Sequence, residues 1–261
     1  MKNINPARFG AIILATLACG SGMSALAQQS APAAKPSLPR TVEVTEYESH
    51  ADPKALSGLL RRRVAIEAQV GSSGKVRFWK AGLCGARSDH LFAMVEYPTG
   101  KEFARGWQKA HGSLDYRQWE ADSHAAGLTS VNRFTMINLS NGSVPAANKD
   151  MSASAPPHVL QFNEFDVGGK RAEFVDGAAK METTIRQLAG DDSGDRRQWT
   201  ISWAGEHANN VVATVEFSSH DAMIRTVEDV DFSPVFLQAI AQGAASGMKR
   251  VFECVMTETR P

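Results

Sequence analysis

The sequence predicts an α+β protein made of two similar units, at residues 41–140 and 158–261. The first observation is an internal repeat. The stretch "RFWKAGLCGARSDHLFAMVEYP" at 77–98 returns in altered form as "RQWTISWAGEHANNVVATVEFS" at 197–218. At an offset of 120 residues, 61 consecutive positions align without a gap and 14 are identical, whereas chance would give about four at average residue usage. The second observation is that strand and helix patterns follow the same order in each unit.

The first unit opens with a predicted strand, "TVEVTEYE", in which Val42 and Val44 share one face. Asp52 and Pro53 then predict the start of a helix, because Asp is a favoured N-cap and Pro is tolerated at the first helical position. We expect this helix to end before Gly71. Its predicted apolar side consists of Ala55, Leu59, Val64 and Ile66.

The remaining elements of the unit follow in order. "KVRFWKAGLC" and "HLFAMVEYP" flank a Gly-Ala-Arg-Ser-Asp turn and predict a β-hairpin. A second helical stretch carries Phe103, Trp107 and Ala110 on one face, and "LTSVNRFTMINL" predicts the closing strand. The second unit repeats this order, so each unit reads β-α-β-β-α-β, which is the ferredoxin-like order.

Composition and charge exclude some functions. An apolar share of 43% and a charged share of 21% are typical of a globular protein. The 28 Lys and Arg residues balance 28 Asp and Glu residues, so no basic field is present to attract nucleic acid or an anionic membrane.

The N-terminus predicts export. Residues 1–27 combine a basic start, the apolar run "FGAIILATLA" and an A-x-A cleavage site that ends at Ala27. This is the layout of a signal peptide, and it is too short for a spanning helix, so a periplasmic or secreted protein is expected. Alternatively, "TLACG" resembles a lipoprotein box with Cys19 as lipid acceptor. We expect a flexible leader at 28–40 and a linker at 141–157.

The pattern of a Trp-bearing strand, a Gly turn and "VEYP" or "VEFS" before a helix resembles the dimeric α/β-barrel superfamily. That group includes antibiotic-biosynthesis-monooxygenase-like and NIPSNAP-like domains. The resemblance covers residues 41–138 and 158–258 and implies that two units pack sheet to sheet, with each last strand reaching the other sheet. Both units are present here, and a single unit has an exposed sheet face to bury. We therefore expect an intramolecular barrel and a monomeric protein.

Two cysteines remain after removal of the signal peptide, Cys84 and Cys254, in an oxidising compartment. The strand crossing that the resemblance implies would make their strands neighbours, and a disulfide would then join the two units. The alternative is two buried free thiols, because Cys is among the most frequently buried residues.

The first candidate site belongs to the first unit. Trp107 and His111 are spaced i, i+4 on the second helical stretch, and Tyr116 and Trp119 follow. The second unit has no such set, and no histidine or cysteine spacing predicts a metal site. Related haem-degrading and quinone-forming proteins use a pocket between sheet and helices, which implies His111 as acid or base and haem as one conceivable ligand. Alternatively, Trp107 is a core residue and His111 interacts with the helix dipole.

The second candidate set is shared by both units. Arg77 with Glu96, and Arg197 with Glu216, lie on adjacent hairpin strands and predict cross-strand ion pairs with a structural role. Trp79 and Trp199 lie beside them, and we expect both to fill the core or the ends of the barrel. Alternatively, Trp79 lines a ligand pocket of the first unit together with Trp107, Tyr116 and Trp119, since bulky aromatic side chains line small-molecule pockets as well as cores.

Three functions are compatible with these observations. The favoured hypothesis is an exported protein that binds a small apolar or aromatic molecule in a pocket of the first unit. The second is a cofactor-independent, monooxygenase-like or haem-handling enzyme that uses His111. The third is a structural or interaction module without catalysis.

Overall fold

The structure, a computed structural model, describes residues 40–139, 156–202, 207–230, 233–245 and 247–261. The predicted signal peptide and Cys19 lie outside the described residues, as do nearly all of the predicted leader and linker. The described residues form two halves, up to Leu139 and from Pro156, with the same order of main elements.

The first half begins with a strand and ends with a strand, as expected. Its elements are β1 (Thr41–Ser49), α1 (Pro53–Gln69), β2 (Lys75–Leu83), η2 (Gly85–Arg87), β3 (Leu91–Tyr97), α2 (Gly100–Gly112), α3 (Leu114–Ala125) and β4 (Leu128–Asn138).

The second helical stretch of this half is divided into α2 and α3. The division lies at Ser113, whose backbone is extended (φ −76°, ψ 150°). Its hydroxyl accepts a hydrogen bond from the Tyr116 backbone N–H at 3.1 Å, so Ser113 ends one helix and caps the next. The break turns α3 so that Tyr116 and Trp119 are buried.

The second half repeats the sequence of elements. They are β5 (Val159–Asp166), α4 (Arg171–Ala189), η3 (Gly190–Ser193), β6 (Asp195–Ser202), β7 (Val211–Phe217), α5 (His220–Val230), α6 (Pro234–Ala245) and β8 (Lys249–Thr259). Within the described ranges, no helix has both the length and the apolar character needed to cross a membrane.

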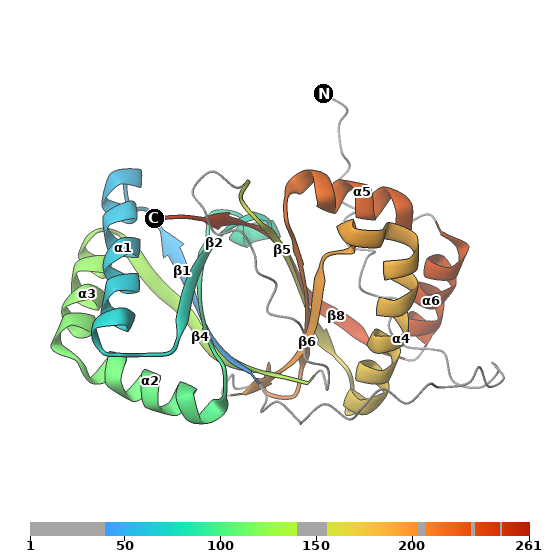
Figure 1. The fold of residues 1–261 in the computed structure, drawn as a ribbon, viewed down its shortest axis with the longest axis horizontal. Helices are drawn as coiled ribbons and strands as arrows, with labels where there is room; N and C mark the ends of the chain where they lie inside the picture. The colour runs from blue at the N-terminus through green and yellow to red at the C-terminus, as the bar shows by residue number, and fades with distance from the viewer. Residues whose placement is uncertain (1–39, 140–155, 203–206, 231–232, 246) are drawn as a thin grey trace.

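The eight strands of the described residues form one closed antiparallel barrel, in the order β1-β3-β2-β8-β5-β7-β6-β4. The joints between the halves are β2–β8 and β4–β6. Figure 1 shows α1 to α3 on one flank and α4 to α6 on the other, so each half covers the outside of its own strands. The predicted α+β class is confirmed, and the strands close into a barrel.

Strand alternation creates three apolar regions. One fills the barrel and includes Val44, Trp79 and Phe162. The other two lie between strands and helices, one in the first half around Trp119 and one in the second half around Phe174. Because successive strand residues face opposite sides, each strand supplies one set to the barrel and one to the helix layer.

Helix α1 begins as predicted but buries a different face. Asp52 accepts hydrogen bonds from the backbone N–H groups of Lys54 at 3.0 Å and Ala55 at 3.1 Å. The prediction was wrong at Val64, which is 39% exposed. The buried positions instead follow the three-to-four residue spacing of one helix face, and that spacing places Arg63 and Glu67 inside.

Helix α2 lies very close to the sheet at Gly106. A Cβ atom at this position would come within 2.5 Å of the Tyr97 ring and 2.8 Å of the Ser72 hydroxyl. We expect Gly106→Ala to cost about 1–3 kcal/mol of stability through overpacking. The control is Gly58→Ala on α1, where nothing lies within 4 Å. Urea denaturation should show the control unchanged or up to about 1 kcal/mol more stable, from helix propensity; equal effects would contradict the close packing.

Candidate functional site

The structure places the predicted site residues on two opposite faces of the strands. Trp79 faces the barrel interior, whereas its neighbour Phe78 faces the helices. Trp107, Tyr116 and Trp119 lie on helices α2 and α3, outside the barrel. The prediction of one pocket that combines Trp79 with these three residues was therefore wrong, because strand alternation turns Trp79 away from the helices.

Outside the barrel, the rings of the first candidate set form a stack. The His111 ring lies between Trp107, at a centroid distance of 4.6 Å, and Tyr116, at 4.1 Å. Tyr116 contacts Trp119 at 5.6 Å, and Trp119 donates its indole N–H to the Leu59 carbonyl at 2.8 Å. Tyr116 and Trp119 are buried and Trp107 is half-buried, so the stack reaches the surface at Trp107.

Charged side chains that the sequence analysis missed surround this stack. Glu43 on β1 places Oε1 3.2 Å from His111 Nε2. Arg133 on β4 places its Nε 3.7 Å from the same Glu43 oxygen and donates a hydrogen bond to the Tyr116 hydroxyl at 3.2 Å. The sequence offered one indication, namely that Glu43 lies on the same strand face as Tyr47. The alternation alone does not show whether that face is buried.

Glu43 is an ionised carboxylate in a buried position. Burial by itself would raise its pKa, but His111 and the charges of Arg63 and Arg133 outweigh this effect and hold the pKa below the ordinary value. Both of its oxygens, and Nε2 of His111, are buried, and apart from the 3.2 Å ion-pair contact between Oε1 and Nε2 they have no hydrogen-bonding partner within the described residues. Such atoms are costly unless a partner satisfies them.

A buried ion pair on α1 completes the group. Arg63 and Glu67 are four residues apart, are joined at 2.6 Å, and have side chains that are both nearly inaccessible. The Arg63 guanidinium lies 4.9 Å from the Tyr116 ring centroid and 5.8 Å from that of Trp119. We call the whole group the outer cluster; it consists of Glu43, Arg63, Glu67, Trp107, His111, Tyr116, Trp119 and Arg133.

The second half has apolar side chains at several of the matching positions, whereas Gln161 and Glu253 stand where the first half has Glu43 and Arg133. Helix α1 begins at Pro53 and α4 begins at Arg171. Counted from these first residues, Arg63 matches Met181 and Glu67 matches Ile185, and Met181 and Ile185 are both buried. Strand register and the serine caps of α3 and α6 give the other matches. Tyr47 matches Phe165, Tyr97 matches Phe217 and Tyr116 matches Phe236.

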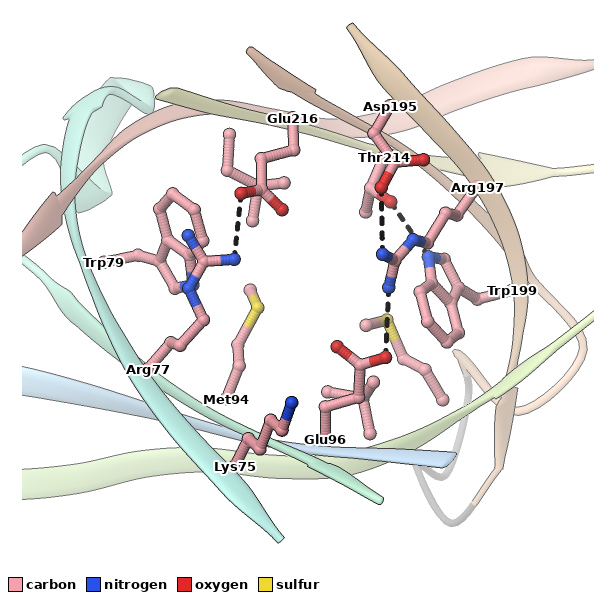
Figure 2. A pocket seen from close by; sticks show the side chains of 13 residues that line it. Lys75, Arg77, Trp79, Met94, Glu96, Asp195, Arg197, Trp199, Thr214 and Glu216 are labelled. Carbon is pink, nitrogen blue, oxygen red and sulfur yellow. Dashed lines mark hydrogen bonds and ion pairs between the residues drawn. The ribbon is translucent and has the colours of Figure 1, made fainter. Parts of the chain in front are cut away.

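Inside the barrel, the predicted arginine and glutamate residues gather at one end (Figure 2). Arg77 pairs with Glu216 at 2.9 Å and with Glu258 at 2.8 Å. Arg197 pairs with Glu96 at 3.1 Å and with Asp195 at 2.9 Å.

The predicted partners within each hairpin were therefore wrong. Along the hairpin, Arg77 lies opposite Met94, whereas Glu96 lies opposite Lys75. Closure of the barrel brings the carboxylate of each half to the arginine of the other half.

Each arginine also lies over a tryptophan. The Arg77 guanidinium is 4.4 Å from the Trp79 ring centroid, and that of Arg197 is 6.0 Å from Trp199. A cavity of about 50 Å³ lies between them. We call its lining the barrel-end cluster; it consists of Val42, Lys75, Arg77, Trp79, Met94, Glu96, Met136, Leu160, Asp195, Arg197, Trp199, Thr214 and Glu216.

A disulfide joins Cys84, just after β2, to Cys254 on β8, with a Cα–Cα distance of 4.2 Å. These strands belong to different halves and are neighbours in the barrel. The bond therefore links the two halves covalently across one of their joints.

The chain is similar in structure to several solved proteins. A "putative monooxygenase" from Fusobacterium nucleatum subsp. nucleatum has a TM-score of 0.50 at 13% identity, over 85% of this chain and 94% of that chain. A second one, from Lactobacillus acidophilus NCFM, has a TM-score of 0.48 at 10% identity, over 85% and 93%. A mutant chlorite dismutase from Candidatus Nitrospira defluvii has a TM-score of 0.48 at 12% identity, over 87% and 93%.

At these identities the likeness concerns the fold alone, which is the predicted ferredoxin-like α+β fold. No protein-family model matches the chain, and no curated protein matches it in sequence. The finer resemblance to antibiotic-biosynthesis-monooxygenase-like or NIPSNAP-like domains stays a prediction.

The two cavities described do not fit a haem. The barrel-end cavity measures about 50 Å³ and a second cavity, beneath α4, about 30 Å³. Pockets for drug-sized ligands measure roughly 300–1,000 Å³. Neither lining includes a histidine or a cysteine as an axial ligand. Among the described residues, no group of three or more His, Cys, Asp or Glu side chains could hold a metal ion.

Proposed function

We propose that the outer cluster is the binding site for a small aromatic molecule that carries a hydroxyl group. The observation that supports this most is the contrast between the halves. The second half packs Met181, Ile185 and Phe236 where the first half buries Arg63, Glu67 and Tyr116. Because buried ion pairs can often be replaced by apolar residues without loss of stability, the fold itself does not require these charges.

The chemistry of the cluster suits such a ligand. The half-buried Trp107 ring, which stacks on His111 at 4.6 Å, offers aromatic surface to a ligand. A ligand hydroxyl beside His111 and Glu43 would satisfy buried atoms that, apart from the Glu43–His111 contact, have no hydrogen-bonding partner within the described residues. Glu43 stays ionised and lies at ion-pair distance from His111, so the imidazole can hold a proton taken from the hydroxyl and return it.

Turnover of the ligand is the alternative within the same site. A cofactor-independent, monooxygenase-like reaction would use His111 for the same proton transfer, and the name of the Fusobacterium protein is compatible with it. An interaction module without a ligand would not explain why the first half buries charged side chains at positions where the second half has apolar ones.

The test uses phenol and the His111→Ala variant of the mature chain. We expect phenol to bind the natural protein and to bind the variant about tenfold more weakly, because a hydrogen-bonding partner of the ligand hydroxyl is lost. Isothermal titration calorimetry measures this difference. The matched control is His124→Ala, an exposed position at the end of α3. Equal phenol affinity of all three proteins would refute the proposal, and His111-dependent oxygen consumption would identify the enzyme.

We further propose that the halves arose as copies of one unit and that the exported protein is a monomer. The barrel closes within one chain, so in the described residues no strand lacks a neighbour on either side. The Cys84–Cys254 disulfide supports an oxidising compartment, because such bonds are rare in the cytosol. Native mass spectrometry of protein from the periplasm, with a mature N-terminus at Gln28, checks the export and the monomeric state.

A further inference from the structure

The barrel-end cavity is separate from the outer cluster. Its lining points into the barrel, on the face of the sheet opposite to the helices. A volume of about 50 Å³ is several times the roughly 10–15 Å³ that one water molecule requires. The cavity therefore has room for part of an organic molecule, with the remainder in the open end of the barrel.

The walls of the cavity combine flat apolar surfaces with fixed ion pairs. Trp79 and Trp199 lie on opposite sides, as Figure 2 shows, and Met94 and Met136 add apolar surface to the lining. Because Arg77 and Arg197 are each held by two carboxylates, their guanidinium groups are neutralised within the protein. These pairs form part of the cavity wall, and other groups determine which ligand charge the cavity accepts.

Lys75 supplies the remaining charge. It lines the cavity and is exposed, and its side chain makes no hydrogen bond or ion pair within the described residues. At the matching position the second half has Asp195, which pairs with Arg197 at 2.9 Å. At the rim, Arg40 pairs with Glu96 and Arg260 pairs with Glu258. This end of the barrel therefore has more basic side chains than carboxylates. The five basic side chains are Lys75, Arg77, Arg197, Arg40 and Arg260, and the four carboxylates are Glu96, Asp195, Glu216 and Glu258.

We propose that the barrel end is a second ligand site, which takes a small aromatic carboxylate. The ring would lie between the indoles, where apolar and aromatic surface is available. The carboxylate would accept a hydrogen bond from the Lys75 ammonium, which is a strong, charge-assisted contact. A cationic ligand would meet an excess of positive charge at this end, and a neutral ligand would leave Lys75 without a partner.

The experiment titrates the mature, disulfide-bonded protein with benzoate, benzyl alcohol and benzylamine in a calorimeter. We expect saturable binding of benzoate, weaker binding of benzyl alcohol and none of benzylamine. Lys75→Met should weaken benzoate about tenfold or more and leave benzyl alcohol unchanged. The matched control is Lys80→Met, an exposed position on the same strand whose side chain lies outside the barrel-end lining.

The proposal is overturned by the absence of saturable benzoate binding, by equal binding of benzylamine, or by an unchanged benzoate affinity in Lys75→Met. The same titration in His111→Ala separates the two sites. Benzoate binding that persists in this variant belongs to the barrel end, whereas binding lost with His111 belongs to the outer cluster and contradicts a second site.

Discussion

Reduction of the Cys84–Cys254 disulfide is expected to lower the free energy of unfolding by about 2–5 kcal/mol. The two cysteines are 170 residues apart in the sequence, so the bond closes a long loop in the unfolded chain and restricts its entropy. For a chain of this size, Tm should fall by roughly 2–4 °C for each kcal/mol lost.

The position of the bond adds to its effect. It lies at the β2–β8 joint, and the second joint between the halves is short, with residues 135–138 of β4 paired to residues 199–202 of β6. By contrast, β1 and β4 pair along nearly their full lengths within the first half. Without the disulfide, the halves are held together by two joints that are shorter than the strand pairings inside each half.

Urea denaturation with and without reductant measures the effect. The matched control is Cys84→Ala with Cys254→Ala, which should unfold like the reduced natural protein and respond to no reductant. An identical midpoint for oxidised and reduced natural protein would contradict the proposed stabilisation of the joint.

Local patterns in the sequence predicted most of the fold. The alternation in "TVEVTEYE", the cap at Asp52 and the hairpin around the Gly-Ala-Arg-Ser-Asp turn all depend on neighbouring residues, and all are present as β1, α1 and the β2–β3 hairpin. The repeat added long-range information, because it indicated that every element has a counterpart 118 to 120 residues away. These features need no knowledge of which strands meet across the barrel.

The site depended on contacts that the sequence does not display. Glu96 was assigned to Arg77 because both lie on one hairpin, but barrel closure gives Glu96 to Arg197 and Arg77 to Glu216. Trp79 was grouped with Trp107 because both are aromatic, although the strand separates them. The alternation shows that a strand has two faces. Which face points into the barrel and which points toward the helices depends on where the helices pack on the sheet.

The buried pair on α1 offers the sharpest test of the outer cluster. Glu67→Ile alone should cost about 3–5 kcal/mol, because it leaves the Arg63 guanidinium buried without its carboxylate. Arg63→Met combined with Glu67→Ile should regain this loss, since Met181 and Ile185 pack at the matching positions of the second half. Urea denaturation of the single and double variants measures both changes.

The double variant should nevertheless bind phenol more weakly than the natural protein. Removal of Arg63 takes away one of the charges that hold the pKa of Glu43 low, and it withdraws the guanidinium from the Tyr116 and Trp119 rings. Calorimetry with phenol on the folded double variant measures this loss. A double variant that is stable and binds phenol normally would show that the ion pair serves neither stability nor binding. A double variant as unstable as Glu67→Ile would show that the first half needs the charges for its packing, which the apolar packing of the second half argues against.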